Sequence, residues 1–231
     1  MRYYLISALL LLIGTFAVLT LPKATDFVDQ SLVFVQIPQN NSQVAGIQKY
    51  NIPPVSQNII PPEFSAKSVL VKDLGTDTIL YQKDTSLRLP IASTTKIATA
   101  LVASEYFQPN SNLTVNRGAE MTGAKVGLIK GENLSFRSLL YGMLLNSGND
   151  AAFTIAENYP GGVLGFVSAM NKKASELDLK NTYFENPAGF DNAEHFSSAS
   201  DLAKITEEAL KNPPLSRIFA TKETSILSLD K

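Results

Sequence analysis

Residues 89–107 of this 231-residue chain read LPIASTTKIATALVASEYF. Apolar residues and alanines recur along it at helical spacing, so we expect a helix from Ala92 to Phe107. Ser93 then lies in the first turn of that helix, and Lys96 follows three residues later on the same face. The stretch therefore predicts a serine and a lysine side by side where a helix begins.

A serine and a lysine in this arrangement have the chemistry of a nucleophile and its base. The free N–H groups and positive dipole end of a helix N-terminus stabilise negative charge that develops at Ser93. Serine is a weak nucleophile without a base, and Lys96 can take its proton if burial lowers the lysine pKa. The four-letter pattern is nevertheless common, because Ser228-Leu229-Asp230-Lys231 has it too. On those letters alone, Ser93 is more often a helix cap.

A second polar cluster, Ser147-Gly148-Asn149, separates two apolar helical runs about fifty residues later. We expect it to present a hydroxyl and an amide to a cleft. The alternative is an interhelix turn in which Asn149 or Asp150 caps the next helix. Ser56-Gln57-Asn58 fits the same three-letter pattern, so the cluster carries little weight by itself.

The remaining periodicity predicts strands followed mostly by helices. Apolar runs at residues 68–71 and 78–81 flank a turn and predict a hairpin. A weak last strand is expected over Thr224–Leu229. This order indicates an α/β domain with a helical lobe. Further helices are expected over 134–146, 151–158 and 164–177, and then from near Ser200 to a point before Pro213-Pro214.

The N-terminal segment indicates that the chain is exported. Residues 3–22 carry no charge, and a helix of twenty residues spans about 30 Å, the thickness of a bilayer core. Arg2 precedes the segment and Asp26 follows it, which favours an N-inside orientation. We expect residues 1–23 to be an uncleaved transmembrane anchor, with a cleaved signal sequence as the alternative.

Two further segments complete the expected organisation. Residues 24–63 are rich in proline, asparagine and glutamine and are typical of a linker. Residues 64–231 hold all the motifs and form the expected functional domain. The linker would keep that domain attached to the membrane but away from its surface.

The composition excludes several kinds of chemistry. The chain has no cysteine, which excludes disulfides, thiolate catalysis and thiolate metal sites. Its one histidine, His195, argues against a multi-histidine metal centre and against a Ser-His-Asp triad unless it is the base. We expect His195 to shape the loop before a helix that Ser198 or Ser200 caps. A net charge of −1 without a basic run gives no basis for nucleic-acid binding, and no metal or other cofactor is indicated.

Together with their flanks, the two motifs resemble the low-molecular-mass penicillin-binding proteins, the serine-type D-alanyl-D-alanine carboxypeptidases. Ser-x-x-Lys followed by Ser-x-Asn is an ordered pair of penicillin-binding proteins and serine β-lactamases. The flanks at residues 89–100 and 139–152 resemble that family, as do segments from Phe166 to Leu202. The resemblance implies a β-lactamase/transpeptidase-like fold, α/β (α+β), with an antiparallel sheet packed on helices plus a helical lobe.

The resemblance also implies a mechanism and a location. Ser93 would attack the carbonyl between two D-alanines of a peptidoglycan stem peptide and form an acyl-enzyme. Lys96 would be the base, Ser147 would relay a proton to the departing D-alanine, and Asn149 would hold the substrate's amide backbone. Penicillins and other β-lactams would acylate the same serine. The implied location is the outer face of the bacterial cytoplasmic membrane, in cell-wall synthesis and cell shape.

Two departures from the family pattern bear on activity. The chain contains no Lys-Thr-Gly or Lys-Ser-Gly, which the family carries roughly a hundred residues after Ser-x-Asn. We therefore expect the chain to end before the last sheet strands and this 231-residue form to be weak or inactive, since one lost oxyanion-hole donor typically costs about 10²–10³ in rate. The second departure is Pro187-Ala188-Gly189-Phe190, where many members have histidine before the glycine and leucine after it.

Two other functions remain open from the sequence. A serine β-lactamase would share Ser93, Lys96 and Ser147, and would need a carboxylate such as Glu185 to activate the deacylating water. A non-catalytic envelope protein would use the same fold to bind peptidoglycan or to sense β-lactams. Rapid turnover of penicillin favours the first, and an unchanged cellular function in a Ser93→Ala variant favours the second.

Overall fold

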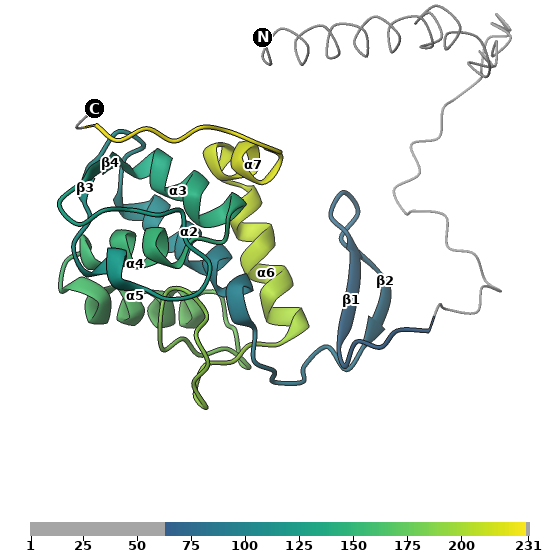
Figure 1. Cartoon of the computed structure of the whole chain (residues 1–231). Helices are drawn as coiled ribbons and strands as arrows, with labels where there is room; N and C mark the ends of the chain where they lie inside the picture. The colour runs from purple at the N-terminus through teal and green to yellow at the C-terminus, as the bar shows by residue number, and fades with distance from the viewer. Residues whose placement is uncertain (1–62, 230–231) are drawn as a thin grey trace, which may run out of the picture. The chain divides into compact units, whose positions relative to one another are not determined.

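The structure is a computed structural model that describes residues 63–229 (Figure 1). The predicted anchor, residues 1–23, lies outside the described residues, as does the predicted linker except for its last residue, Glu63. Within the part that is described, no helix is long and apolar enough to cross a membrane.

The predicted hairpin is confirmed as β1 (Val69–Asp73) and β2 (Thr78–Lys83), an antiparallel pair with a register shift in β1 between Val71 and Lys72. At its turn, the Asp73 carboxylate accepts hydrogen bonds from the backbone N–H and the hydroxyl of Thr76, both at 2.7 Å. These bonds fix the turn, because an aspartate that binds backbone nearby mimics a turn hydrogen bond.

The predicted helix over residues 92–107 is confirmed with one change at its start. A single 3-10 turn, η1 (Ala92–Thr94), runs into α2 (Thr95–Tyr106). Figure 1 shows α2 among the other helices, and it contacts α3 (Phe136–Leu145), α4 (Asn149–Glu157), α5 (Gly162–Glu176) and α6 (Ala199–Leu210). Because four helices pack against α2, the position of its first turn in the domain is well determined.

The three middle helices are also confirmed, but a small sheet near them was not predicted. β3 (Asn112–Thr114) pairs antiparallel with β4 (Asn133–Ser135). Each strand has three residues, too few for the alternation that identifies a strand in a sequence. Ser135 ends β4 and caps α3, since its side chain accepts a hydrogen bond from Ser138 N.

The C-terminal part differs most from the prediction. Ser198 caps α6 by accepting from Asp201 N, as expected for one of the two serines proposed there. The prolines that were expected only to stop α6 also begin α7 (Pro213–Phe219), where a missing N–H is tolerated in the first turn. The weak strand expected over Thr224–Leu229 is wrong, because that segment forms no ladder in the structure. Its β-branched residues had favoured a strand, but a strand also requires a pairing partner.

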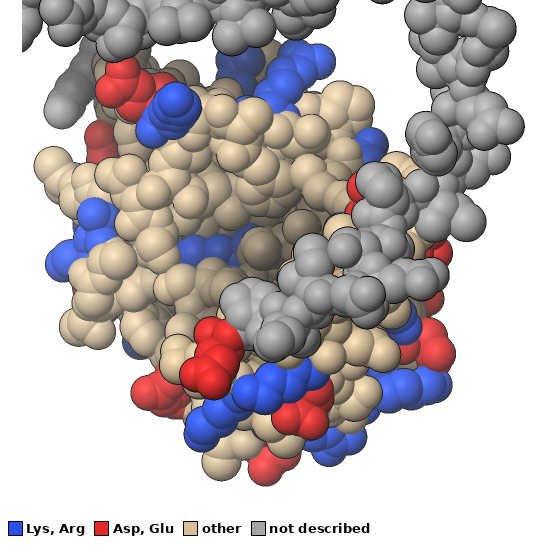
Figure 2. All heavy atoms as spheres, turned by 90° about the vertical axis from the view of Figure 1, so that its right-hand side faces the viewer, with Lys and Arg blue, Asp and Glu red and all other residues tan. Residues whose placement is uncertain are grey.

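The core lies between the helices. Fully buried aromatic and aliphatic side chains fill it, including Phe136, Phe166, Phe184 and Met170. On the face shown in Figure 2, acidic and basic side chains are interspersed around a hollowed, mostly uncharged centre. No single sign of charge dominates that face.

Candidate active site

Ser93 and Lys96 lie next to each other at the start of α2, as predicted. The Lys96 Nζ donates to Ser93 Oγ at 3.1 Å. Ser93 is exposed, whereas Lys96 is 2% exposed. The alternative that Ser93 is a helix cap is wrong, since the cap positions are Ile91 and Thr94 and neither makes a side-chain cap bond. The serine hydroxyl is therefore presented to solvent and to the lysine.

The buried Lys96 ammonium joins the two sequence motifs. An ammonium has three N–H donors, which the surrounding acceptors must share. Burial lowers the pKa of Lys96 to about 8, because the charged form loses its hydration. The neutral amine is therefore accessible near physiological pH. Its partners besides Ser93 are Ser147 Oγ at 3.4 Å, Asn149 Oδ1 at 2.8 Å and the carbonyl oxygen of Ala188 at 2.9 Å.

The turn between α3 and α4 presents Ser147. Its φ of 56° is in the left-handed region, which residues other than glycine seldom adopt. Gly148 N donates to Gly142 O at 3.1 Å, and Gly148 is the residue that precedes α4. The alternative that Asn149 or Asp150 caps α4 is wrong, because the helix begins at Asn149 after a glycine. The turn instead directs the Ser147 hydroxyl toward Lys96.

Asn149 connects Lys96 to a neighbouring loop. Its side chain is 7% exposed; Oδ1 accepts from Lys96, and Nδ2 donates to Thr122 O at 2.7 Å. The carboxamide NH₂ has two N–H groups, so one remains to meet a ligand. A Cβ on Gly123 would lie only 2.9 Å from Asn149 Nδ2, which shows how closely the loop packs there. The loop therefore fixes the orientation of the amide.

Two acidic side chains of α4 hold this loop at both ends. The fully buried Asp150 carboxylate accepts from three successive N–H groups, those of residues 126–128, at 2.9–3.1 Å. Glu157 accepts in the same way from the N–H groups of residues 116–118, at 2.7–3.1 Å. Sequence reasoning weighed Asp150 only as a helix cap, and missed its role in holding the loop over Asn149.

His195 lies behind the first turn of α2 and is 3% exposed. Its Nδ1 accepts from Glu185 N at 3.1 Å, so Nε2 carries the proton and donates to Thr95 Oγ1 at 2.8 Å. Burial lowers the pKa of His195, which favours the neutral ring. These contacts agree with the expectation that His195 shapes the surrounding loops.

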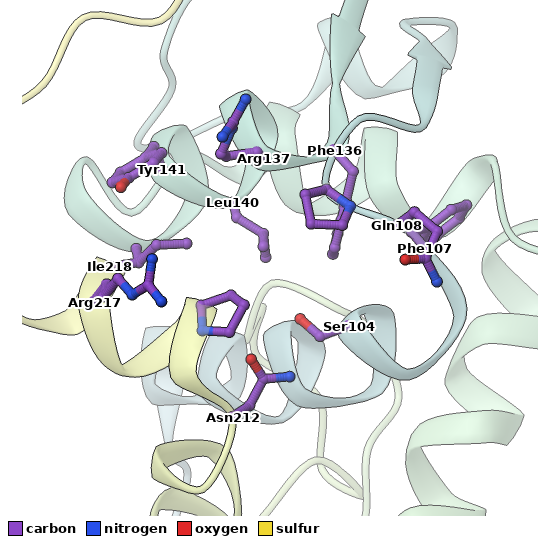
Figure 3. Close-up of a pocket in the computed structure, with 12 residues that line it drawn as sticks. Ser104, Phe107, Gln108, Phe136, Arg137, Leu140, Tyr141, Asn212, Arg217 and Ile218 are labelled. Atoms are coloured by element: carbon purple, nitrogen blue, oxygen red, sulfur yellow. The ribbon is translucent and has the colours of Figure 1, made fainter.

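A separate cavity of about 470 Å³ lies between α2, α3 and α7 (Figure 3). Side chains of Phe136, Leu140 and Ile218 contribute its apolar walls, and the four predicted site residues are not among those that line it. Ser104 also borders it, and its Oγ is buried without a hydrogen-bond partner in the described part of the chain. The cavity is thus distinct from the cluster around Lys96.

Comparison with solved structures identifies the fold. The chain aligns with the crystal structure of the Streptomyces K15 DD-transpeptidase at 30% identity and a TM-score of 0.67, covering 74% of each chain. It aligns with the D-alanyl-D-alanine carboxypeptidase of Mycobacterium tuberculosis H37Rv at 34% identity and a TM-score of 0.68, covering 72% of this chain and 64% of the other. The predicted β-lactamase/transpeptidase-like fold is confirmed.

The sequence comparisons identify the family. Residues 55–229 match the family described as Peptidase_S11, D-alanyl-D-alanine carboxypeptidase, and the chain belongs to that family. It is 38% identical to the D-alanyl-D-alanine carboxypeptidase DacF of Bacillus subtilis over 68% of this chain and 42% of the relative. It is 34% identical to a D-alanyl-D-alanine endopeptidase of Pseudomonas aeruginosa over 75% of this chain and 57% of the relative. The chain therefore spans about half the length of these curated relatives.

Proposed function

We propose that this chain carries the acylation site of a serine-type D-alanyl-D-alanine carboxypeptidase that also binds penicillin. The observation that supports this most is the position of Lys96 Nζ, 3.1 Å from Ser93 Oγ and 3.4 Å from Ser147 Oγ. A buried amine with its pKa lowered to about 8 is a suitable base for a serine hydroxyl near neutral pH.

The proposed reaction begins with proton transfer from Ser93 Oγ to the neutral amine of Lys96. Ser93 Oγ then attacks the carbonyl carbon of the bond between two D-alanines and forms a tetrahedral intermediate. When the C–N bond breaks, Ser147 relays a proton from Lys96 to the departing amine, and D-alanine leaves. Water hydrolyses the remaining ester, which releases the shortened peptide and restores the Ser93 hydroxyl.

Asn149 is the proposed substrate-binding residue. Its Oδ1 is occupied by Lys96, and one N–H of its amide is occupied by Thr122 O. The second N–H is the group that we assign to a carbonyl of the substrate's backbone. Asn149 would thus link the position of the substrate to the position of the base.

The proposed substrates are peptidoglycan stem peptides that end in D-Ala-D-Ala, and β-lactams are the proposed inhibitors. Relatives named for D-alanyl-D-alanine carboxypeptidase activity support this assignment. We further propose that residues 1–23 anchor the protein and that the domain works at the outer face of the cytoplasmic membrane. The uncharged segment at residues 3–22 supports that part of the proposal.

Covalent labelling with a fluorescent penicillin tests the proposal on the 231-residue chain. We expect weak but measurable labelling that is lost in Ser93→Ala and kept in Ser228→Ala, the serine of the duplicate Ser-x-x-Lys pattern. A folded wild-type chain that remains unlabelled, or a Ser93→Ala variant that is labelled equally, contradicts the proposal. Rapid release of hydrolysed penicillin in place of a lasting adduct identifies a β-lactamase instead.

A further inference from the structure

The segment Asn186–Phe190 contains the second departure from the family pattern, and its shape is set by one side chain. Asn186 Oδ1 accepts from three successive backbone N–H groups, those of Ala188 at 3.2 Å, Gly189 at 2.7 Å and Phe190 at 2.9 Å. Asn186 Nδ2 donates back to Phe190 O at 3.0 Å. One carboxamide therefore closes the segment into a compact turn.

Gly189 places this turn directly against the backbone that carries Ser93. Its φ is 89°, and a Cβ at this position would lie 1.8 Å from Ala92 O and 3.0 Å from Ser93 N. A separation of 1.8 Å between two unbonded atoms is not possible, so only glycine permits the approach. Ala92 itself has a φ of 45°, an uncommon conformation for a residue with a side chain.

The same segment also contacts the helix that carries Lys96. The Ala188 carbonyl accepts from Lys96 Nζ at 2.9 Å, and the Pro187 carbonyl accepts from Thr99 Oγ1 at 2.7 Å. Phe190 packs against Phe153 of α4, with ring centroids 5.7 Å apart. The turn is therefore fixed between α2 and α4, and it touches both members of the Ser93–Lys96 pair.

We propose that Asn186–Phe190 is the positioning element of the Ser93–Lys96 pair, with Asn186 and Gly189 as its positioning residues. Gly189 determines the position of the Ala92–Ser93 turn, and Ala188 O orients the Lys96 amine by accepting its hydrogen bond. Asn186 holds Ala188 and Gly189 in place through the hydrogen bonds from their N–H groups. The inference rests on the proposed function, since it concerns the rate at which Ser93 is acylated. Reacting groups misplaced by about 1 Å lose roughly 10²-fold in rate, which is the effect expected here.

The chain offers a matched control for Gly189. Gly131 has the same φ of 89°, but a Cβ there would meet nothing within 4 Å. Gly189→Ala and Gly131→Ala therefore both place an alanine at the same left-handed φ, and only the first collides with the Ser93 turn. We expect penicillin to acylate Gly189→Ala about 10²-fold more slowly than wild type and Gly131→Ala at close to the wild-type rate. Equal acylation rates in the two folded variants overturn the inference.

Variants of Asn186 test the same element without a clash. Asn186→Ala removes the acceptor of three N–H groups, whereas Asn186→Asp keeps acceptor oxygens in place. We expect the alanine variant to lose acylation rate with little change in non-covalent penicillin affinity, and the aspartate variant to recover much of the rate. The inference is wrong if the aspartate variant is no faster than the alanine variant, or if only affinity changes.

The pH profile separates positioning from a general loss of stability. A carbonyl that accepts from the Lys96 ammonium stabilises the charged form, so displacing Ala188 O lowers the pKa of the amine. The rise of the acylation rate with pH should therefore shift to lower pH in Asn186→Ala, and an unshifted profile argues for a structural role only. Failure of wild-type labelling refutes the proposed function, whereas wild-type labelling with unaffected variants refutes this inference alone.

Discussion

The turn before Ser93 and the turn that carries Ser147 each hold a residue other than glycine at positive φ, Ala92 at 45° and Ser147 at 56°. Such conformations cost about 1–3 kcal/mol each and persist only where the surrounding structure enforces them. The first turn is supported from a distance in the sequence, by Gly189 packed on Ala92 O. The second is supported by other segments, because Gly148 N donates to Gly142 O of α3 and Asn149 N donates to Ala124 O in the loop that Asp150 holds.

This difference determines which changes should reach which serine. Changes in the segment Asn186–Phe190 should displace Ser93 and leave the Ser147 turn in place. Changes at the start of α4 should affect Ser147 and Asn149 first. Lys96 donates a hydrogen bond to the serine of each turn, so replacing it should affect both Ser93 and Ser147.

Replacing Lys96 is therefore expected to have the largest effect. Lys96→Met removes the proposed base, and acylation by penicillin should slow by about 10²–10⁴-fold. Lys96→Arg keeps the charge but should fail as well, because a guanidinium does not deprotonate near neutral pH. In the wild type, the acylation rate should rise with pH around the lysine pKa of about 8, as the amine becomes neutral. The rate is measured by stopping the reaction with a fluorescent penicillin at set times and counting the labelled protein. An acylation rate that does not change between pH 6 and pH 9.5 contradicts this assignment.

Asp150 tests the second turn through the loop that it holds. Asp150→Asn places an NH₂ group among backbone N–H donors inside the protein, and the free energy of unfolding should fall by about 3 kcal/mol. Urea denaturation measures this. Glu157→Gln is the matched control, since Glu157 holds the other end of the loop but is only partly buried. Glu157→Gln should lower the free energy of unfolding by less than Asp150→Asn does. A larger loss in Glu157→Gln would show that Asp150 is not the side chain that contributes most to holding the loop.

The sequence predicted the side chains of the site better than its backbone. Ser93, Lys96, Ser147 and Asn149 were selected by spacing and resemblance, and the structure brings them together. Ala188 and Thr122 contribute hydrogen-bond acceptors to the site through their backbone carbonyl oxygens. Every residue has such an oxygen, so the residue types in the sequence do not predict these contacts. They depend on loop conformations that long-range contacts impose.

The errors in the fold have a similar origin. The hairpin and the long helices follow from local periodicity, which a sequence displays directly. A proline pair both ends one helix and begins another, so Pro213 alone did not reveal α7. The segment Thr224–Leu229 has strand-forming residues but lies where it forms no ladder. Pairing of this kind is decided by tertiary structure and is absent from local sequence.

Relieving the strained conformations should have a smaller effect and separates strain from chemistry. Ser147→Gly and Ser147→Ala both lose the hydroxyl, but only glycine adopts a φ of 56° without steric strain. Both variants should be acylated slowly, and the glycine variant should be more stable than the alanine variant by about 1 kcal/mol. Thermal melting of the pair measures the difference. If the alanine variant is the more stable of the two, the turn does not store strain.

The smallest expected effect concerns His195, which supports the Ser93 turn through Thr95. Burial lowers the pKa of His195 in the folded protein, so the unfolded chain, with an ordinary pKa near 6.5, binds the proton more readily. The histidine therefore does not reduce stability above about pH 6.5, and stability falls as the pH drops below that value. Urea denaturation at pH 7.5 and pH 5.0 should show a larger loss for the wild type than for His195→Gln, which cannot take up the proton. Carboxylates contribute equally to both proteins, so an identical loss in the two would exclude His195 as the titrating group.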